Sequence, residues 1–150
     1  MIIHKKFLSV QTFIIISFIL LIITGCGNPT VNILMKSADD SNDMNAIQIK
    51  IFQLRSSEKF KLASRESLLR NAEETLGKDL IPNSIIEKIM IPGESFYLED
   101  LQLNDETKYI GVIGDFYQHA KNSWSQLIDI SKGNDDIKIT IGKNFLSVTN

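Results

Sequence analysis

The sequence predicts a mainly β protein, a β-sandwich with one short helical insertion. Two observations support this fold class. Apolar and polar residues alternate in several short segments, such as AIQIKI (46–51) and DIKITI (136–141), and this period of two is typical of strands with one buried face. Between Ser64 and Gly77, in contrast, apolar residues recur at every fourth position, which predicts a helix. One helix among about eight strands indicates a sandwich with an insertion.

Each expected strand is a short apolar or alternating segment bounded by turn residues. Segment 108–116 is apolar on both faces, as expected of a central strand covered from two sides, and its Gly111 and Gly114 either relieve crowding or mark a bulge. Pro92-Gly93 favours a type II turn, so we expect its two flanking segments to form a hairpin. The eight segments are 31–36, 46–51, 85–91, 95–103, 108–116, 125–130, 136–141 and 144–148.

The helical segment carries its own boundary signals. Glu66 and Arg70 form an i,i+4 pair of opposite charge, and Gly77 stands where a helix C′ residue is expected. The apolar face consists of Leu68, Ala72 and Leu76.

The N-terminus has the organisation of a secretory signal. Lys5 and Lys6 precede a 17-residue apolar run, Phe7 to Ile23, which falls short of the ~20 residues that a spanning helix needs. The run is followed by Thr24, Gly25 and Cys26, the single cysteine of the 150 residues. A lone thiol cannot form an intramolecular disulfide, and two histidines leave too few partners for a zinc site.

The letters ITGC at 23–26 resemble the bacterial lipobox, which is cut by lipoprotein signal peptidase between Gly25 and Cys26. The resemblance implies that Cys26 becomes the first mature residue, with a diacylglycerol on its sulfur and an acyl chain on its amine. Two or more chains anchor a protein stably. The alternative is an uncleaved N-terminal helix with a buried cysteine. Gly27, instead of an aspartate, follows Cys26 and favours the outer membrane of a two-membrane bacterium, with the protein facing the periplasm.

Cleavage would divide the chain into a signal peptide (1–25), a lipidated linker (26–30) and a β-sandwich domain (31–150). The 125 mature residues fit one domain. Lys5 and Lys6 are the charged residues removed, so 14 basic residues face 18 acidic ones, a net charge of −4. No stripe of Lys and Arg with interleaved aromatics indicates a nucleic-acid partner.

No catalytic or metal site is predicted. His119 is the single mature histidine, expected in an exposed loop, and no glycine-flanked serine completes a triad. Asp39 to Asp43 has oxygens at alternate positions, but an EF-hand loop starting at Asp39 would need Gly at its sixth place and Glu at its twelfth. Those places hold Met44 and Lys50.

Two further candidates have ordinary structural interpretations. Glu99 and Asp115 could form a glycosidase pair, but strand faces need polar residues in any case. Trp124, the single tryptophan, is expected to be largely buried in the core, with a ligand platform as the alternative.

Taken in order, the mature segments resemble the TssJ (SciN) family, outer-membrane lipoproteins of the type VI secretion membrane complex. The matching pieces follow the lipobox and the short first strand, and they cover nearly all of the mature chain. They are IQIKIFQLRSSEKF, LLRNAEETLGKDLI, the IPGE turn, KYIGVIGDFYQHAKNSW and the terminal pair of strands. The chain departs from the family at Tyr117 or Gln118, where an arginine is frequent, and in the polar stretch before IQIKI, which lacks the usual proline.

The resemblance implies a transthyretin-like β-sandwich without enzymatic activity or a cofactor beyond the lipid on Cys26. Its function would be to tether the periplasmic C-terminal part of a TssM-type inner-membrane protein to the outer membrane. The alternative is a periplasm-facing ligand-binding lipoprotein or a pilotin of another secretion apparatus. The resemblance places partner binding in the loop between the first two strands, which we expect to be acidic, flexible and replaceable without loss of stability. That loop comprises Ser37, Ala38, Asp39, Asp40, Ser41, Asn42, Asp43, Met44 and Asn45.

Overall fold

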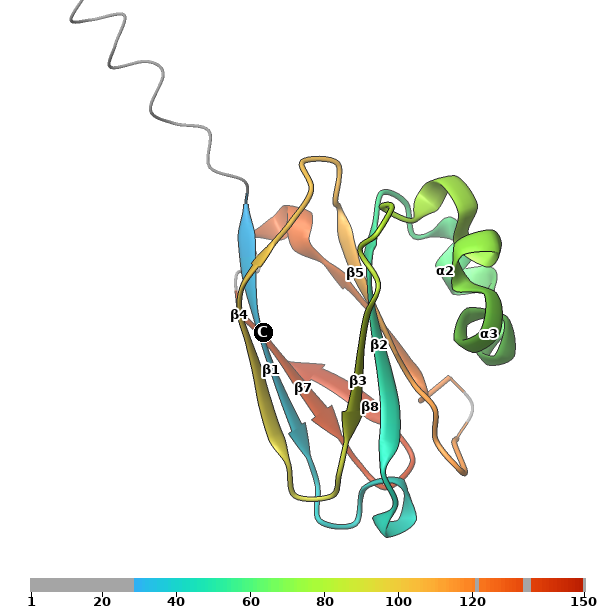
Figure 1. The fold of residues 1–150 in the computed structure, drawn as a ribbon, viewed down its shortest axis with the longest axis vertical. Helices are drawn as coiled ribbons and strands as arrows, with labels where there is room; N and C mark the ends of the chain where they lie inside the picture. Colours follow the sequence, from blue (N-terminus) through green and yellow to red (C-terminus); the bar gives the residue numbers. More distant parts are fainter. Residues whose placement is uncertain (1–28, 121, 134–135, 150) are drawn as a thin grey trace, which may run out of the picture.

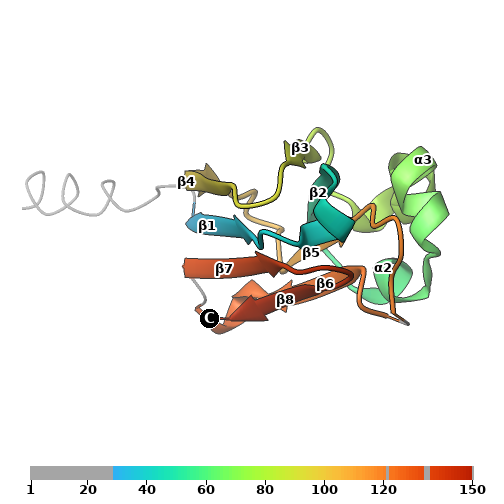
Figure 2. The same ribbon diagram turned by 90° about the horizontal axis from the view of Figure 1, so that it is seen from below.

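Two four-stranded sheets packed face to face form the body of the molecule (Figures 1 and 2). The computed structural model describes residues 29–120, 122–133 and 136–149. One sheet has the order β4-β1-β7-β8 and contains β1 (Thr30–Ser37), β4 (Ser95–Gln102), β7 (Asp136–Ile141) and β8 (Leu146–Thr149). The other has the order β3-β2-β5-β6 and contains β2 (Ile47–Leu54), β3 (Ile86–Met90), β5 (Tyr109–Gly114) and β6 (Ser125–Asp129). The predicted fold class is confirmed for these residues.

The strand pairing brings together segments that are distant in the sequence. β1 lies between β4 and β7, antiparallel to the first and parallel to the second. β2 lies between β3 and β5, antiparallel to both. The N-terminal region with Gly25 and Cys26 lies outside the described residues. Of the expected linker 26–30, Thr30 already belongs to β1, and the carbonyl of Pro29 accepts a 2.8 Å hydrogen bond from Leu103 N–H.

The main core fills the space between the sheets with the alternating apolar residues that the sequence predicted. Ile47, Ile49 and Ile51 point inward from β2 and are at most 1% exposed. They pack against the inward residues of the facing sheet, among them Ile33, Met35, Ile137, Ile139 and Ile141. Burial of this kind contributes roughly 25 cal/mol per Å² of apolar surface.

Two helices cover the outer face of the β3-β2-β5-β6 sheet (Figure 2). They are α2 (Glu58–Leu62) and α3 (Arg65–Leu76), followed by the 3-10 turn η2 (Gly77–Asp79). The predicted helix is α3, in which Ser64 Oγ accepts from Ser67 N–H at 3.1 Å and Glu66 pairs with Arg70 at 2.9 Å. α2 is too short for a periodic signal, and the sequence did not predict it.

The helices and the sheet share a second core. Its buried members are Phe52, Leu54, Phe60, Leu68, Ala72, Leu76, Leu80 and Ile113. β2 continues beyond the alternating stretch 46–51 as far as Leu54. Its outward residues Phe52 and Leu54 are apolar because they lie beneath the helices. A Cβ on Gly111 would lie 2.6 Å from the Phe60 ring, while the register of β5 with β2 is continuous. Gly111 therefore relieves crowding and does not mark a bulge.

The predicted hairpin around Pro92-Gly93 is wrong, although the turn itself is present. Glu94 N–H donates to Ile91 O at 3.1 Å, and Gly93 has a φ of +77°, as a type II turn requires. β3, however, pairs with β2, and β4 pairs with β1. The turn therefore carries the chain from one sheet to the other. β3 bonds to the edge of β2 in one sheet, and β4 bonds to the edge of β1 in the other.

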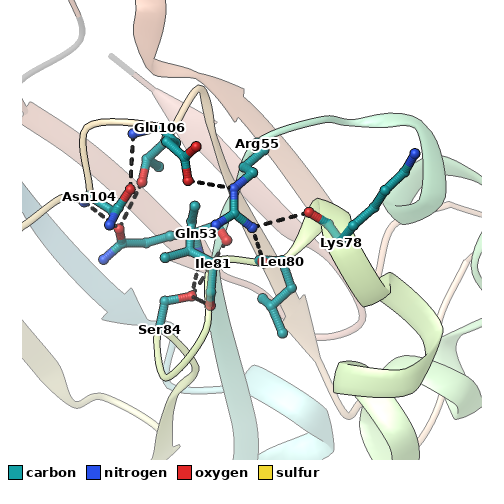
Figure 3. Close-up of polar contacts among 9 residues, drawn as sticks. Gln53, Arg55, Lys78, Leu80, Ile81, Ser84, Asn104 and Glu106 are labelled. Carbon is teal, nitrogen blue, oxygen red and sulfur yellow. Dashed lines mark hydrogen bonds and ion pairs between the residues drawn. The ribbon is translucent and has the colours of Figure 1, made fainter.

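A polar cluster joins the helical insertion to the sandwich (Figure 3). It lies next to Leu103, whose N–H bonds Pro29 O at the start of β1. The buried Gln53 accepts from Asn104 N–H at 3.0 Å and from Thr107 Oγ1 at 2.9 Å. Arg55 donates to the carbonyls of Lys78 and Leu80 and pairs with Glu106 at 2.8 Å. These bonds connect β2, the segment after α3 and the β4–β5 loop.

Candidate partner interface

The end of the sandwich farthest from the start of β1 contains the loop that the sequence assigned to partner binding. Ser37–Asn45 connects β1 in one sheet to β2 in the other (Figure 1). Ala38 N–H donates to Ile141 O at 2.9 Å, and Ala38 O accepts from Gly93 N–H at 3.3 Å. The loop is thus bonded to the β7–β8 turn and to the β3–β4 turn.

The loop reverses direction through left-handed backbone and not through glycine or proline. Its short turn η1 (Ser41–Met44) has φ values of 48°, 54° and 61° at Asn42, Asp43 and Met44. Asn and Asp tolerate this region better than other non-glycine residues. The sequence alone, without a glycine or proline in the stretch, gave no indication of this geometry.

Asn42 is the central residue of the loop. Only 4% of it is exposed, and its side chain accepts a 2.6 Å hydrogen bond from Tyr117 N–H and donates a 2.8 Å bond to Ala46 O. Its own carbonyl accepts from Asn45 N–H at 3.1 Å. Asn42 therefore fixes both the loop and the segment after β5.

The burial of part of this loop speaks against the expectation that it can be replaced without loss of stability. Ser37, Ser41 and Asn42 are buried, and the Ser37 and Ser41 hydroxyls are 2.6 Å apart. Their side chains support the loop from inside and present nothing to a partner. A Gly/Ser replacement from Asp39 to Met44 would remove Ser41 and Asn42 and therefore lower stability.

The exposed part of the loop is small and mainly acidic. Asp39, Asp40, Met44 and Asn45 are exposed. Asp43 is partly exposed and pairs with Lys143 of the β7–β8 turn at 3.2 Å, which offsets its charge. Of the nine residues that the sequence nominated, these are the ones whose side chains can meet a partner, beside the partly buried Ala38.

An open cleft of about 630 Å³ lies beside the loop. It is lined by Asn42, Asp43, Asn45 and Ala46 from the loop side and by Arg65, Asp115, Phe116 and Tyr117 from α3 and the segment after β5. Arg65, the first residue of α3, pairs with Asp115 at 2.6 Å and donates to Phe116 O at 3.1 Å. The sequence did not nominate Arg65 or Tyr117, because only tertiary structure brings them next to the loop.

The β3–β4 turn next to the loop carries a charged cluster. Lys88 pairs with Glu94 at 2.8 Å and lies 4.9 Å from the centroid of the Phe96 ring. The bond from Lys88, together with the Ile91 N–H bond, holds the pKa of the Glu94 carboxyl below its ordinary value. The Lys88–Glu94 pair stabilises the β3–β4 turn, and Asp39 lies next to Gly93 of this turn.

The catalytic alternatives are not brought together. Glu99 lies on β4 and Asp115 follows β5, so these exposed carboxylates belong to different sheets. His119 is exposed in the β5–β6 loop, as predicted, and within the described ranges no cluster of three or more metal-ligating side chains forms. Trp124 is of intermediate burial and packs against both cores, in line with the expected position in the core, although it is not fully buried.

Comparison with solved structures places the fold in a defined class, and no curated protein sequence matches the chain. The T6SS lipoprotein TssJ1 from Pseudomonas aeruginosa is 22% identical with a TM-score of 0.75, over 82% of this chain and 96% of that one. The Lip protein of Serratia marcescens, a membrane-bound component of the type VI secretion system, is 19% identical with a TM-score of 0.69, over 80% and 96%. A chain in a structure of the T6SS TssM C-terminal domain from EAEC is 20% identical with a TM-score of 0.68, over 81% and 98%.

These likenesses define the fold class, a two-sheet β-sandwich with a helical insertion. The family model T6SS-SciN, described as type VI secretion lipoprotein, VasD, EvfM, TssJ, VC_A0113, matches residues 26–144. The chain belongs to this family, as the resemblance predicted. Of the helices that the structure describes, none has the length and apolar character to cross a membrane.

Proposed function

We propose that this protein is a structural lipoprotein that tethers the periplasmic C-terminal part of a TssM-type inner-membrane protein to the outer membrane. Cys26 carries the lipid, and the exposed part of the loop between β1 and β2 meets the partner. The protein faces the periplasm and acts without catalysis. Family membership supports this proposal, as does a similar chain in a structure of the TssM C-terminal domain.

The observation that carries the proposal is the direction of β1, whose two ends lie at opposite ends of the sandwich. Pro29 and Thr30 lie at one end of this strand, and the loop begins with Ser37 at the other (Figure 1). Eight strand residues rise roughly 26 Å at ~3.3 Å each. Only Gly27 and Asn28 separate Cys26 from Pro29, so a lipid on Cys26 would hold the near end within about 11 Å of the membrane surface. The loop end then points away from the membrane, towards the periplasm.

The core favours a tether over the ligand-binding alternative. Side chains at most 5% exposed fill the space between the sheets, including Phe116, Met90 and Leu103. The cleft beside the loop is open to the exterior and lined by polar groups of Asn42, Arg65 and Asp115. A protein-binding end fits this arrangement better than an enclosed small-molecule site.

Binding to the partner tests the proposal directly. The full-length lipoprotein, extracted in detergent, is titrated with the periplasmic C-terminal domain of the TssM-type protein from the same bacterium. We expect the wild type to bind, and Asp39→Asn/Asp40→Asn to slow association and to reduce its salt dependence, since exposed charges act mainly on encounter rates. Glu99→Gln, an exposed carboxylate on β4, is the matched control. The tether function is excluded if the wild type does not bind this domain.

A further inference from the structure

Besides Phe145 of the β7–β8 turn (41% exposed), four exposed large hydrophobic side chains lie in the segments at the loop end of the molecule. They are Met44 (76% exposed), Ile89 (64%), Ile91 (57%) and Tyr117 (79%), out of seven such side chains among the described residues. Met44, Ile89 and Ile91 are termed the apolar shelf below. Isolated exposed apolar residues need no explanation, but a contiguous group of them marks interaction sites.

Strand geometry places the shelf on the outer face of the β3-β2-β5-β6 sheet. In β3, Lys88 contacts Phe96 and Met90 is fully buried in the core, so Ile89 between them points outward. Ile89 is paired with Gln48 and Met90 with Ile47, which puts Ile91 near the start of β2, where Met44 lies three residues before Ile47. Gln48 O accepts from Asp115 N–H at 2.9 Å, so the shelf adjoins the cleft that Tyr117 borders.

The helical insertion leaves this part of the sheet bare. Lys50 is the first outward residue of β2 beneath the insertion, and its Nζ donates to Leu69 O of α3 at 2.7 Å. Phe52 and Leu54 follow under the helices. In Figure 1 the helices lie beside the half of the sheet nearer to the start of β1, and only the first residue of α3, Arg65, reaches the cleft beside the β1–β2 loop.

An acidic rim borders the shelf. Asp39 Oδ1 lies 3.1 Å from the position that a Cβ on Gly93 would take, immediately beyond Ile91 and Pro92. Asp40 follows and is exposed, and neither carboxylate forms an ion pair within the described part of the chain. A complementary surface would therefore place basic groups next to apolar ones.

We propose that the apolar shelf is the second half of the partner interface, occupied by an apolar segment of the TssM-type partner that has basic side chains beside it. This inference rests on the proposed function and extends the contact from the loop to β3. The charges disfavour a second copy of this chain, since a symmetric contact would bring two rims of Asp39 and Asp40 together. The apolar half would supply affinity, while the acidic rim would guide association.

The test compares two sets of variants in the titration of the full-length lipoprotein with the partner's periplasmic domain. Ile89→Ser/Ile91→Ser removes two of the three shelf side chains and leaves the buried core residues unchanged. We expect its Kd to rise at least about tenfold, mainly through faster dissociation, with a less negative heat-capacity change and an unchanged salt dependence. Leu62→Ser on α2 and Tyr97→Ser on β4, exposed residues outside the shelf, are the controls and should bind like the wild type. Circular dichroism verifies that every variant is folded.

The outcomes separate the two proposals. If Asp39→Asn/Asp40→Asn alters binding but Ile89→Ser/Ile91→Ser does not, the tether function stands and the shelf inference is wrong. If the controls weaken binding as much as the shelf variant, a general loss of surface hydrophobicity is responsible and the inference is also wrong. Sedimentation of the wild type alone completes the test. A dimer that disappears in Ile89→Ser/Ile91→Ser would identify a second copy as the occupant and overturn the inference.

Discussion

The side-chain oxygen of Asn42 accepts a 2.6 Å hydrogen bond from the backbone N–H of Tyr117, a residue 75 positions away. This bond holds the loop between β1 and β2 against the segment that follows β5. The same Asn42 side chain donates to Ala46 O at 2.8 Å, so both of its polar ends are used. Asn42 and Tyr117 both line the cleft at the loop end, so this buried amide helps to fix the shape of the cleft.

Asn42→Ala should therefore destabilise the fold and loosen the loop end. The substitution leaves two backbone groups without partners and places alanine at a φ of +48°, for an expected loss of about 2–4 kcal/mol. Urea unfolding measures the loss. Asn42→Gly is the matched control, since it loses the same bonds without the left-handed strain. Equal stability of Asn42→Ala and the wild type would show that the bond to Tyr117 is unimportant.

Cys26→Ser should abolish lipidation. We expect an unprocessed product that leaves the outer-membrane fraction, together with loss of secretion, because a serine cannot carry the thioether-linked lipid that provides the anchor. Mass spectrometry of the protein and fractionation of the membranes provide the measurement. Gly27→Ala keeps the cysteine and should behave like the wild type. Continued fractionation of Cys26→Ser with the outer membrane would refute the anchor.

Gly111→Ala tests the packing of α2 on the sheet. The new methyl group would meet the Phe60 ring at 2.6 Å and Leu54 at 3.1 Å, so we expect a loss of about 1–3 kcal/mol from overpacking. Phe60→Leu provides a smaller side chain at the point of contact. In a double-mutant cycle, Gly111→Ala should cost less in the Phe60→Leu background. Additive costs would place the clash elsewhere.

Trp124→Ala should cost about 2–3 kcal/mol, less than the roughly 3–5 kcal/mol of a fully buried tryptophan. Trp124 packs against the edges of both cores but remains partly exposed, and its carbonyl accepts a 2.8 Å bond from Gly114 N–H that the variant retains. Trp124→Phe keeps a ring at this position and should lose less. Because the chain has one tryptophan, its fluorescence reports on this site alone. Emission equal to that of free tryptophan would contradict the packing.

The Glu94 carboxyl should make stability depend on pH at the acidic end. In the folded state the pKa of this carboxyl is lowered from 4.5, chiefly by the hydrogen bond from Lys88. The charged carboxylate therefore stabilises the fold above pH 4.5, and this contribution is lost as the pH falls through the folded-state pKa. We therefore expect the Tm difference between the wild type and Glu94→Gln to be constant above about pH 6 and to shrink below about pH 4.5. Glu99→Gln on the same strand is the control. If the Tm difference between the wild type and Glu94→Gln persists unchanged at low pH, the difference comes from packing and not from the charge of Glu94.

The sequence alone determined the local structure. Alternation predicted the strands, because a strand with one buried face exposes every second residue, as Ile137, Ile139 and Ile141 show. The spacing of Leu68, Ala72 and Leu76 predicted α3, and the apolar segment 108–116 predicted that β5 is covered on both faces. These features depend on neighbours within a few residues, so a single sequence contains them.

Tertiary structure decided which strands pair and which loop residues are buried. Alternation is the same for any partner strand, so Pro92-Gly93 could not reveal that its turn crosses between the sheets. The polarity of SADDSNDMN likewise indicated a solvated loop, whereas Ser41 and Asn42 are buried because their bonding partners come from other parts of the fold. The segments that carry Met44, Ile89 and Tyr117 come to the same end of the molecule only through the pairing of β2 with β3 and β5. Contacts between distant segments depend on the free energy of the whole packed chain, and no local pattern encodes them.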